Sequence, residues 1–452
     1  MKSVPGLLQN SIEGETLFDT FSKGLYSTDA SIYQIEPIGV ILPKNVNDVV
    51  STLQIASQHG TSVTPRGAGT SQSGQSIGPG IIVDTSKSLN KIGEIDHKTK
   101  RIKVQPGVVL DHLNQFLEPH GLFFPVDPGA DASIGGMAST RASGTNAVRY
   151  GTMRETVMSL KVVLADGRVI QTARRSRKSS AGYDLTRLFV GSEGTLGIIT
   201  EVTLKLFGIP EAIASAVCSF PTIEDAVNSV IASIQSGIPV ARIELLDDIT
   251  MRAINNFSKT DYPIAQTLFY EFHGSQAGVE EQSRQAQEIA AEFGGGNFQW
   301  ETLPEDRSRL WQARHDALYA MNALRPGSKP MVTDVCVPIS RLSECILETK
   351  QDIDESTLEA PIAGHVGDGN FHVVYLIDPK DEQEIEEAGT MHDRLVMRAL
   401  SMGGTCTGEH GIGYGKINFL NAELGEGVGV MREIKKALDP DNIMNPGKVV
   451  QV

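Results

Sequence analysis

Apolar and polar positions follow two different periods along this chain, one typical of strands and one typical of helices. Residues 37–57 read as a short apolar strand, a turn begun by a proline, and a helix with one apolar side that starts after Asn45, a suitable N-cap residue. Alternation and short apolar runs indicate further strands, and Asp166-Gly167 marks a hairpin in the last of them. These strands cover residues 61–67, 81–86, 101–107 and 159–170, and helices are predicted over 108–120 and 184–189.

Beyond about residue 210 the pattern changes, and the predicted amphipathic helices become longer. Helices are predicted over 220–237, 277–295, 301–324 and 384–404, and strands over 242–250, 268–274 and 331–339. The last residues read as a helix, an Asp-Pro turn and the sequence Asn445-Pro446-Gly447-Lys448. This pattern predicts two α+β domains with a boundary between Phe207 and Pro210.

Composition narrows the class of protein. The chain has 452 residues and a formal net charge of −15 at pH 7, which disfavours nucleic-acid binding because that needs a basic face. The sequence contains no run of about eighteen apolar residues, so no membrane span is predicted, and its start resembles neither a secretory signal nor a transit peptide. The four cysteines form no CxxC pair, which favours a reducing compartment. A cytoplasmic protein is therefore expected.

Four glycine-rich loops lie in the first half of the chain. They are 65–71 (PRGAGTS), 127–136 (DPGADASIGG), 143–146 (SGTN) and 191–200 (GSEGTLGIIT). Glycines followed by hydroxyl residues expose successive backbone N–H groups, which can hold a phosphate. One such loop is as often a plain tight turn, and the spacing is neither a Rossmann fingerprint nor a P-loop. Four together predict a backbone that closely follows an extended ligand with a pyrophosphate.

These loops, with ASGTNAVRYGTM over 142–153, resemble the FAD-binding domain of the family related to vanillyl-alcohol oxidase. The resemblance runs from about Pro37 to the C-terminus and is strongest to cytochrome-linked D-lactate dehydrogenases, with glycolate oxidase flavoprotein subunits and D-2-hydroxyglutarate dehydrogenases as near relatives. It implies an α+β fold: two subdomains over 1–208 that hold non-covalent FAD, a cap domain over 209–425 with a metal site, and a segment over 426–452 that packs back on the FAD domain. The FAD contacts that it implies are Pro65, Arg66, Gly67, Ala68, Gly69, Thr70, Ser71, Asp127, Pro128, Ser133, Ile134, Gly135, Gly136, Ser139, Thr140, Ser143, Gly144, Glu193, Gly194, Ile198 and Asn445.

Residues 364–372, GHVGDGNFH, place two histidines at the ends of a turn. A type I′ turn with Asp368 and Gly369 at its tip would pair His365 with His372 on one face, with Cβ atoms about 4.5–5.5 Å apart. That spacing suits two imidazoles that share one divalent cation. Two partly exposed histidines on an ordinary hairpin are the alternative, and a slip of the turn by one residue would separate the rings.

A carboxylate and a third histidine, Glu409 and His410, lie in the glycine-flanked loop 403–415. Adjacent residues of an extended segment point in opposite directions, so one of them can bind a metal ion while the other faces a different site. Two histidines and one carboxylate leave metal positions open for substrate or water. The resemblance implies that His365, His372 and Glu409 bind the metal, zinc or alternatively manganese or iron, and that His410 is the catalytic base.

Substrate contacts are expected on the helix around Trp311, where Arg314 and Leu318 follow on the same face. Arginine suits bidentate binding of a carboxylate, although a surface salt bridge is its more ordinary role. The resemblance implies that Arg314 and Lys329 contact the substrate carboxylate. In hydroxyglutarate-specific relatives two polar residues stand where this chain has Leu318 and Val374. That favours a monocarboxylic 2-hydroxy acid, because a second buried carboxylate would lack partners there.

The resulting hypothesis is a dehydrogenase for D-lactate or a longer aliphatic D-2-hydroxy acid. The base accepts the hydroxyl proton, hydride passes to FAD, and electrons leave to a cytochrome, a quinone or an electron-transfer flavoprotein. A homodimer is one open arrangement. Three rivals also stay open: a glycolate- or hydroxyglutarate-specific sister enzyme, a zinc hydrolase, and a non-catalytic flavoprotein subunit. The hydrolase would leave the four glycine loops unexplained.

Overall fold

The computed structural model describes residues 3–174, 176 and 178–452, and it divides into two compact units. Unit 1 comprises Met1–Gly144, Gly151–Ile209 and Glu409–Val452, and unit 2 comprises Thr145–Tyr150 and Pro210–Gly408. The change of unit at Pro210 lies beside the boundary expected from the sequence. The returning segment begins at Glu409, earlier than the expected residue 426, and residues 145–150 join unit 2 although they interrupt unit 1 in sequence.

Unit 1 is built on two main sheets. The first has the order β1-β2-β4-β3; its pairs β2–β4 and β3–β4 are parallel, and β1–β2 is antiparallel. The second is antiparallel and has the order β5-β6-β10-β8-β9. The strands are β1 Glu15–Leu17, β2 Gly39–Leu42, β3 Val63–Arg66, β4 Ile81–Asp84, β5 Ile92–Asp96, β6 Arg101–Val104, β8 Val157–Val163, β9 Val169–Gln171 and β10 Ile198–Lys205, with a small separate pair of β7 Leu122–Phe123 and β11 Phe207–Gly208. The predicted hairpin is confirmed, since β8 and β9 pair and Gly167 N donates to Leu164 O at 2.9 Å.

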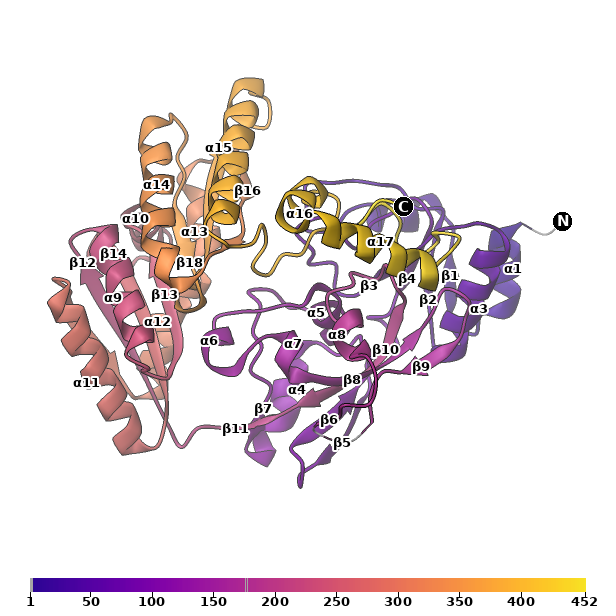
Figure 1. Ribbon diagram of the computed structural model, residues 1–452, viewed down its shortest axis with the longest axis horizontal. Coiled ribbons are helices and arrows are strands. Elements are labelled where there is room, and N and C mark those ends of the chain that lie inside the picture. The colour runs from indigo at the N-terminus through magenta and orange to yellow at the C-terminus, as the bar shows by residue number, and fades with distance from the viewer. Residues whose placement is uncertain (1–2, 175, 177) are drawn as a thin grey trace. The chain divides into compact units, whose positions relative to one another are not determined.

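The helices of unit 1 pack on these sheets, and the last two of them, α16 and α17, come from the C-terminal part of the chain. They are α1 Val4–Ser11, α2 Thr20–Leu25, α3 Val46–Gln58, α4 Leu110–Leu117, α5 Ile134–Thr140, α7 Met153–Thr156, α8 Leu185–Phe189, α16 Ile417–Leu424 and α17 Glu426–Leu438. Asn45 caps α3 as predicted, because its side chain accepts from Asp48 N at 3.1 Å. The returning segment, yellow in Figure 1, runs beside β3: Val63 N donates to Ile443 O at 2.7 Å, and Asn445 N donates to Val63 O at 2.8 Å.

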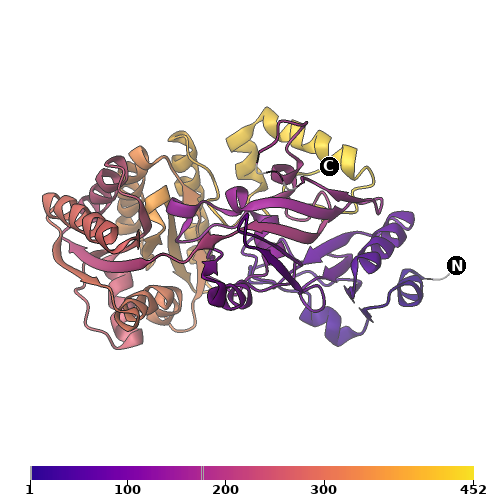
Figure 2. The same ribbon diagram turned by 90° about the horizontal axis from the view of Figure 1, so that it is seen from below.

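Unit 2 is one antiparallel sheet with helices on both sides, as Figure 2 shows. The order is β15-β12-β14-β13-β18-β19-β16, and β17 pairs with β19. The strands are β12 Ala212–Phe220, β13 Val240–Leu246, β14 Gln266–Gly274, β15 Gly296–Glu301, β16 Lys329–Val332, β17 Val335–Cys336, β18 Ile362–Gly364 and β19 Asn370–Ile377. The helices are α6 Ala147–Tyr150, α9 Ile223–Gln235, α10 Asp248–Ser258, α11 Gln276–Glu292, α12 Pro304–His315, α13 Ala317–Leu324, α14 Leu342–Glu355 and α15 Glu382–Ser401.

Two predicted elements of unit 2 are interrupted. The helix expected over 301–324 is two helices, α12 and α13, with Asp316 between them; its carboxylate accepts from Gln312 at 2.8 Å and from Ser258 at 3.2 Å. The strand expected over 331–339 is divided into β16 and β17.

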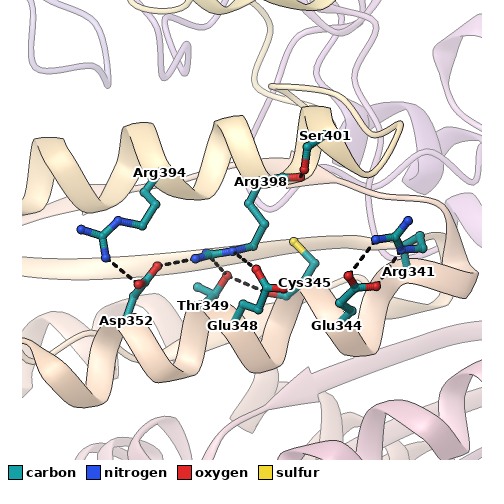
Figure 3. A network of polar contacts seen from close by, with 9 residues as sticks. All are labelled: Arg341, Glu344, Cys345, Glu348, Thr349, Asp352, Arg394, Arg398 and Ser401. Atoms are coloured by element: carbon teal, nitrogen blue, oxygen red, sulfur yellow. Dashed lines mark hydrogen bonds and ion pairs between the residues drawn. The ribbon is translucent and has the colours of Figure 1, made fainter.

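Helices α14 and α15 are joined by a network of ion pairs (Figure 3). Arg398 on α15 reaches Glu348 at 2.8 Å and Asp352 at 2.6 Å, and Arg394 also contacts Asp352 at 2.6 Å. The Arg398 side chain is only 10% exposed, so these contacts are partly shielded from water. Across the part of the chain that the structure describes, no helix has the length and apolar character needed to cross a membrane.

Candidate functional site

A pocket in unit 1 gathers residues from three of the four glycine loops. Its walls come from the ends of β3 and β4, from α5, and from the turn that leads into β10. The lining residues are Pro65, Arg66, Gly67, Ser71, Gln75, Ser76, Thr85, Pro106, Gly135, Gly136, Ser139, Thr140, Glu193, Gly194, Gly197, Ile198 and Ile199.

Of the 21 predicted FAD contacts, 11 line this pocket; they come from the first, second and fourth loops and from Ser139 and Thr140 on α5. The ten that do not line it are Ala68, Gly69, Thr70, Asp127, Pro128, Ser133, Ile134, Ser143, Gly144 and Asn445. The FAD contacts of all 21 residues stay predictions. Sequence reasoning missed Gln75, Ser76, Thr85, Pro106, Gly197 and Ile199. The first two continue the polar, glycine-rich run after the first loop, and that continuation was the available signal.

Glycine is required where the pocket walls are closely packed. A Cβ on Gly67 would lie 2.1 Å from Ser133 Oγ, and one on Gly135 would lie 2.3 Å from Pro106 Cβ. Gly194 has a φ of +71°, which strains any other residue. The walls therefore present backbone and hydroxyl groups at close range. This donor set fits the pyrophosphate and extended shape of FAD.

Glu193 connects this pocket to the loop that carries His410. It is a buried residue with a φ of +51°, and its carboxylate accepts from Ile412 N at 2.7 Å and from Gly413 N at 2.8 Å. Burial raises the pKa of Glu193, against the lowering effect of these hydrogen bonds. Gln75 also donates to His410 O at 2.8 Å. Two residues of the pocket thus fix the backbone of the predicted base.

Asn445 does not line the pocket, but it binds the backbone of two residues that do. Its amide nitrogen donates to Gln75 O at 3.0 Å and to Glu193 O at 2.6 Å, and the residue is 1% exposed. Next to it, the ammonium of Lys448 contacts Ile77 O and Asn445 Oδ1, and burial lowers the pKa of Lys448 to about 7. The tail therefore holds two lining residues in place.

The histidine turn in unit 2 differs from the predicted hairpin. His372 pairs across the strands with Ala363, not with His365, and a single 3₁₀ turn over Val366–Asp368 replaces the two-residue tip. Gly369, with a φ of +89°, closes that turn. The predicted register is therefore wrong. The two rings nevertheless lie with centroids 5.6 Å apart at an angle of 84°.

Each of the two imidazoles is oriented through its Nδ1 atom. Nδ1 of His365 lies 2.8 Å from Glu244 Oε1, and Nδ1 of His372 lies 2.9 Å from Thr333 O. Both partners only accept, so each Nδ1 carries a proton, and in the neutral ring Nε2 is then the nitrogen with the lone pair. Histidines that bind metal ions in proteins are fixed in this way, by a carboxylate or a carbonyl on the opposite nitrogen. Ligand nitrogens of the two rings lie within 4.8 Å of each other.

The loop that leads to Glu409 is anchored in unit 2 beside these histidines. Thr407 Oγ1 donates to the buried Asp334 at 2.6 Å, and Asn370 donates to the other oxygen of the same carboxylate at 2.9 Å. A Cβ on Gly408 would lie 2.2 Å from Asn370 Nδ2, so only glycine fits there. Glu409 is the next residue, and with it the chain enters unit 1.

Arg314 shares a partner with His365. Its Nε and Nη2 atoms lie 2.9 and 2.7 Å from Glu244 Oε2, and Glu244 is fully buried. Burial alone would raise the pKa of Glu244, but His365 and Arg314 lower it below its ordinary value. Sequence reasoning missed Glu244. The available signal was a lone carboxylate inside the apolar strand around RIELL, since an unpaired charge is costly there.

The other predicted substrate residues occupy different environments. Leu318 lies on α13, beyond the break at Asp316, and is 41% exposed, so Trp311, Arg314 and Leu318 do not share one continuous helix face as expected. Val374 is 2% exposed and belongs to an apolar cluster that includes Trp311. Lys329 is exposed at the start of β16. The substrate roles of these residues stay predictions.

Two protein-family models match this chain, one in its N-terminal part and one in its C-terminal part. The family model described as "FAD linked oxidases, C-terminal domain" matches residues 209–449, and the model described as "FAD binding domain" matches residues 37–173. Together they cover the histidine turn of unit 2 and the pocket residues from Pro65 to Thr140, whereas the pocket residues from Glu193 to Ile199 lie between the two matches. The expected α+β, FAD-binding architecture is confirmed.

Individual relatives agree with the family matches. The chain is 49% identical to "Probable D-lactate dehydrogenase, mitochondrial" of Danio rerio, over 94% of this chain and 87% of that protein. It is 46% identical to "D-lactate dehydrogenase [cytochrome], mitochondrial" of Arabidopsis thaliana, over 92% of this chain and 73% of that protein. The fold is similar to that of 4-ethylphenol oxidase from Gulosibacter chungangensis, with a TM-score of 0.81, 18% identity, and coverage of 99% of this chain and 96% of the other.

Proposed function

We propose that this chain, which belongs to the FAD-linked oxidase family, oxidises D-lactate or a longer aliphatic D-2-hydroxy acid to the 2-oxo acid. The names of its relatives support the substrate class and suggest a cytochrome as electron acceptor. The structural observation that carries the proposal is the chain of contacts from Arg314 through Glu244 to His365. Through Glu244, this chain of contacts connects the Arg314 guanidinium, which is suited to binding a carboxylate, with the His365 imidazole, which is suited to binding a metal ion.

FAD, when bound, supplies the acceptor for the hydride from substrate C2. The lining residues of the unit 1 pocket would hold it, with glycine backbone and hydroxyl groups around the pyrophosphate. Arg66 adds positive charge there, and its guanidinium is fixed by Thr28 O at 2.8 Å and by the ring of Tyr26, whose centroid is 5.2 Å from Cζ. A cationic group held in this way favours a doubly charged pyrophosphate.

His365, His372 and Glu409 would hold a divalent ion, zinc or alternatively manganese or iron. That ion supplies Lewis acidity, which makes an alcohol easier to deprotonate. Arg314 binds the substrate carboxylate through the guanidinium end opposite Nε, with Lys329 as a second basic contact. His410 accepts the hydroxyl proton at its imidazole, and Gln75 and Glu193 hold the backbone from which that ring extends.

The side chains of Leu318 and Val374 select against dicarboxylates. Val374 is buried in an apolar cluster, so a second carboxylate placed there would lose its hydration without gaining a partner. Short aliphatic substituents avoid that cost. D-Lactate is therefore preferred over D-2-hydroxyglutarate.

An anaerobic flavin-reduction assay tests this function. Holoprotein is mixed with D-lactate, L-lactate, glycolate or D-2-hydroxyglutarate, with and without prior chelator treatment, and the visible flavin band is followed. D-Lactate should bleach the band, the chelator should suppress the bleaching, and His410→Ala should slow it by about 100-fold or more while FAD stays bound. Preferential bleaching by glycolate or D-2-hydroxyglutarate, or bleaching by none of the four acids, would refute the proposal.

A further inference from the structure

Glu244 is a buried carboxylate that two functional side chains share. It lies on β13 with 0% exposure, and its oxygens contact Nε and Nη2 of Arg314 at 2.9 and 2.7 Å and Nδ1 of His365 at 2.8 Å. All three contacts are N–H groups that donate. A buried carboxylate is stable in such a place only when its oxygens are satisfied, and these donors satisfy them.

A second carboxylate on the neighbouring strand has the same kind of partners. Glu271 on β14 lies 2.8 Å from His273 Nε2 and 3.5 Å from Arg242 Nε. There, however, the other ring nitrogen of the histidine is 2.7 Å from the hydroxyl of Tyr150, a residue of the same unit. His365 instead faces a second imidazole, that of His372. The two clusters thus share a carboxylate, an arginine and a histidine, but only the Glu244 cluster includes a second imidazole suited to a metal ion.

We infer that Glu244 is a positioning residue that couples metal binding to substrate-carboxylate binding. The inference rests on the proposed function, because it takes His365 as a metal ligand and Arg314 as the carboxylate contact. By accepting the proton of Nδ1, Glu244 keeps the lone pair of His365 on Nε2. By accepting from Nε and Nη2, it fixes the plane of the Arg314 guanidinium. One side chain therefore sets the directions of both groups.

Glutamine at position 244 tests this coupling, because an amide has one acceptor oxygen where the carboxylate has two. In Glu244→Gln, the Arg314 and His365 donors compete for that oxygen, and the amide N–H₂ faces one of them. The matched control is Glu271→Gln, which removes a buried carboxylate with an arginine and a histidine partner from the same sheet. Both variants are purified with FAD, stripped with chelator, and titrated with Zn²⁺ by calorimetry.

Glu244→Gln should weaken Zn²⁺ binding by about 10- to 100-fold and raise the KM for D-lactate, whereas Glu271→Gln should change the Zn²⁺ affinity by less than about threefold. A double variant, Glu244→Gln with Arg314→Met, removes the competing donor. Its glutamine oxygen can serve His365 alone, so Zn²⁺ affinity should return toward that of the wild type while D-lactate binding is lost. A merely structural role for Glu244 predicts no such recovery.

The outcomes separate this inference from the function on which it rests. If the wild type binds Zn²⁺ and Glu244→Gln binds it equally well, the coupling is refuted and the metal site stands. The same conclusion follows if the two single variants weaken Zn²⁺ binding to the same extent. If the wild type binds none of Zn²⁺, Mn²⁺ and Fe²⁺, the metal site of the proposed function fails and this inference fails with it. If Glu244→Gln does not fold, the double variant, in which both charges are removed together, carries the test.

Discussion

At the scale of single residues, Glu271 shows how a buried carboxylate contributes to stability. Burial alone would raise its pKa, but Arg242 and the hydrogen bond with His273 lower the pKa from 4.5 to about 2. Because the folded pKa lies below the ordinary value, the stabilisation is complete above pH 4.5 and is lost as the pH falls toward 2. Glu271→Gln should lower the free energy of unfolding at pH 7 by on the order of 3 kcal/mol, at 1.36 kcal/mol per pKa unit. The difference from the wild type should shrink below pH 4.5.

Urea unfolding followed by tryptophan emission reports on unit 2, which contains Glu271, because both tryptophans, Trp300 and Trp311, lie in that unit. Glu344→Gln is the control, since Glu344 forms an exposed pair with Arg341 and should alter stability little at any pH. A difference between Glu271→Gln and the wild type that stays constant from pH 7 to pH 3.5 would show that the charge of Glu271 is not what stabilises the fold.

At the scale of elements, the histidine turn marks the limit of sequence reasoning. The sequence predicts two strands and a turn at Asp368 and Gly369, and both strands exist. The register is missed because distant contacts decide it: the side chain of Asn370 donates to Asp334 at 2.9 Å and to Val335 O at 2.7 Å. A turn propensity of a few tenths of a kcal/mol cannot compete with such buried hydrogen bonds. The two imidazoles nevertheless lie close together, although the backbone conformation that brings them together differs from the predicted hairpin.

The same distinction between local pattern and distant partner applies to the glycine loops and to Glu244. The loops are readable because several glycine and hydroxyl residues stand close together in sequence, and the pocket does gather three of them. Glu244 meets Arg314 and His365 from far along the chain, so its partners are known only once the sheet is assembled.

The α14–α15 pair offers a prediction at this scale. Arg398 is 10% exposed and bridges Glu348 and Asp352, whereas Arg341 is 42% exposed and pairs with Glu344 on its own turn. Arg398→Ala should destabilise unit 2 by roughly 2–3 kcal/mol, because it leaves a partly buried Asp352 with less compensation. Arg341→Ala should change stability by less than about 0.5 kcal/mol. Equal losses in urea unfolding of the two variants would contradict the claim that burial determines the value of these ion pairs.

At the scale of the whole molecule, the end of the chain completes unit 1. Ile443 and Met444 are buried in the core around β3 and β4. Lys435 is 2% exposed, and its ammonium contacts Asp439 and donates to Met444 O at 2.7 Å and to Thr195 O at 2.8 Å. The sequence predicted that a C-terminal segment returns to the FAD domain. It could not predict that the return starts at Glu409, because that boundary depends on contacts of Glu193 with Ile412 and Gly413.

Removal of residues 439–452 should therefore abolish FAD binding, even though none of these residues lines the pocket. The truncation takes two apolar residues from the core, leaves the buried ammonium of Lys435 with fewer partners, and removes the Asn445 amide that holds Gln75 and Glu193. Its cost of roughly 5 kcal/mol or more equals much of the stability of a typical domain. The ratio of flavin to protein absorbance, measured after gel filtration, should fall toward zero, and proteolysis of unit 1 should accelerate.

Two milder changes separate pocket support from core loss. Asn445→Ala removes the two amide hydrogen bonds and should lower FAD occupancy while leaving most of the core intact, at a cost of about 2 kcal/mol. Removal of Gln451 and Val452 alone, both exposed, should leave FAD content unchanged. If the 439–452 truncation retained full FAD content, the tail would be an accessory to unit 1, and the positions of Gln75 and Glu193 would have to be set by the rest of the unit.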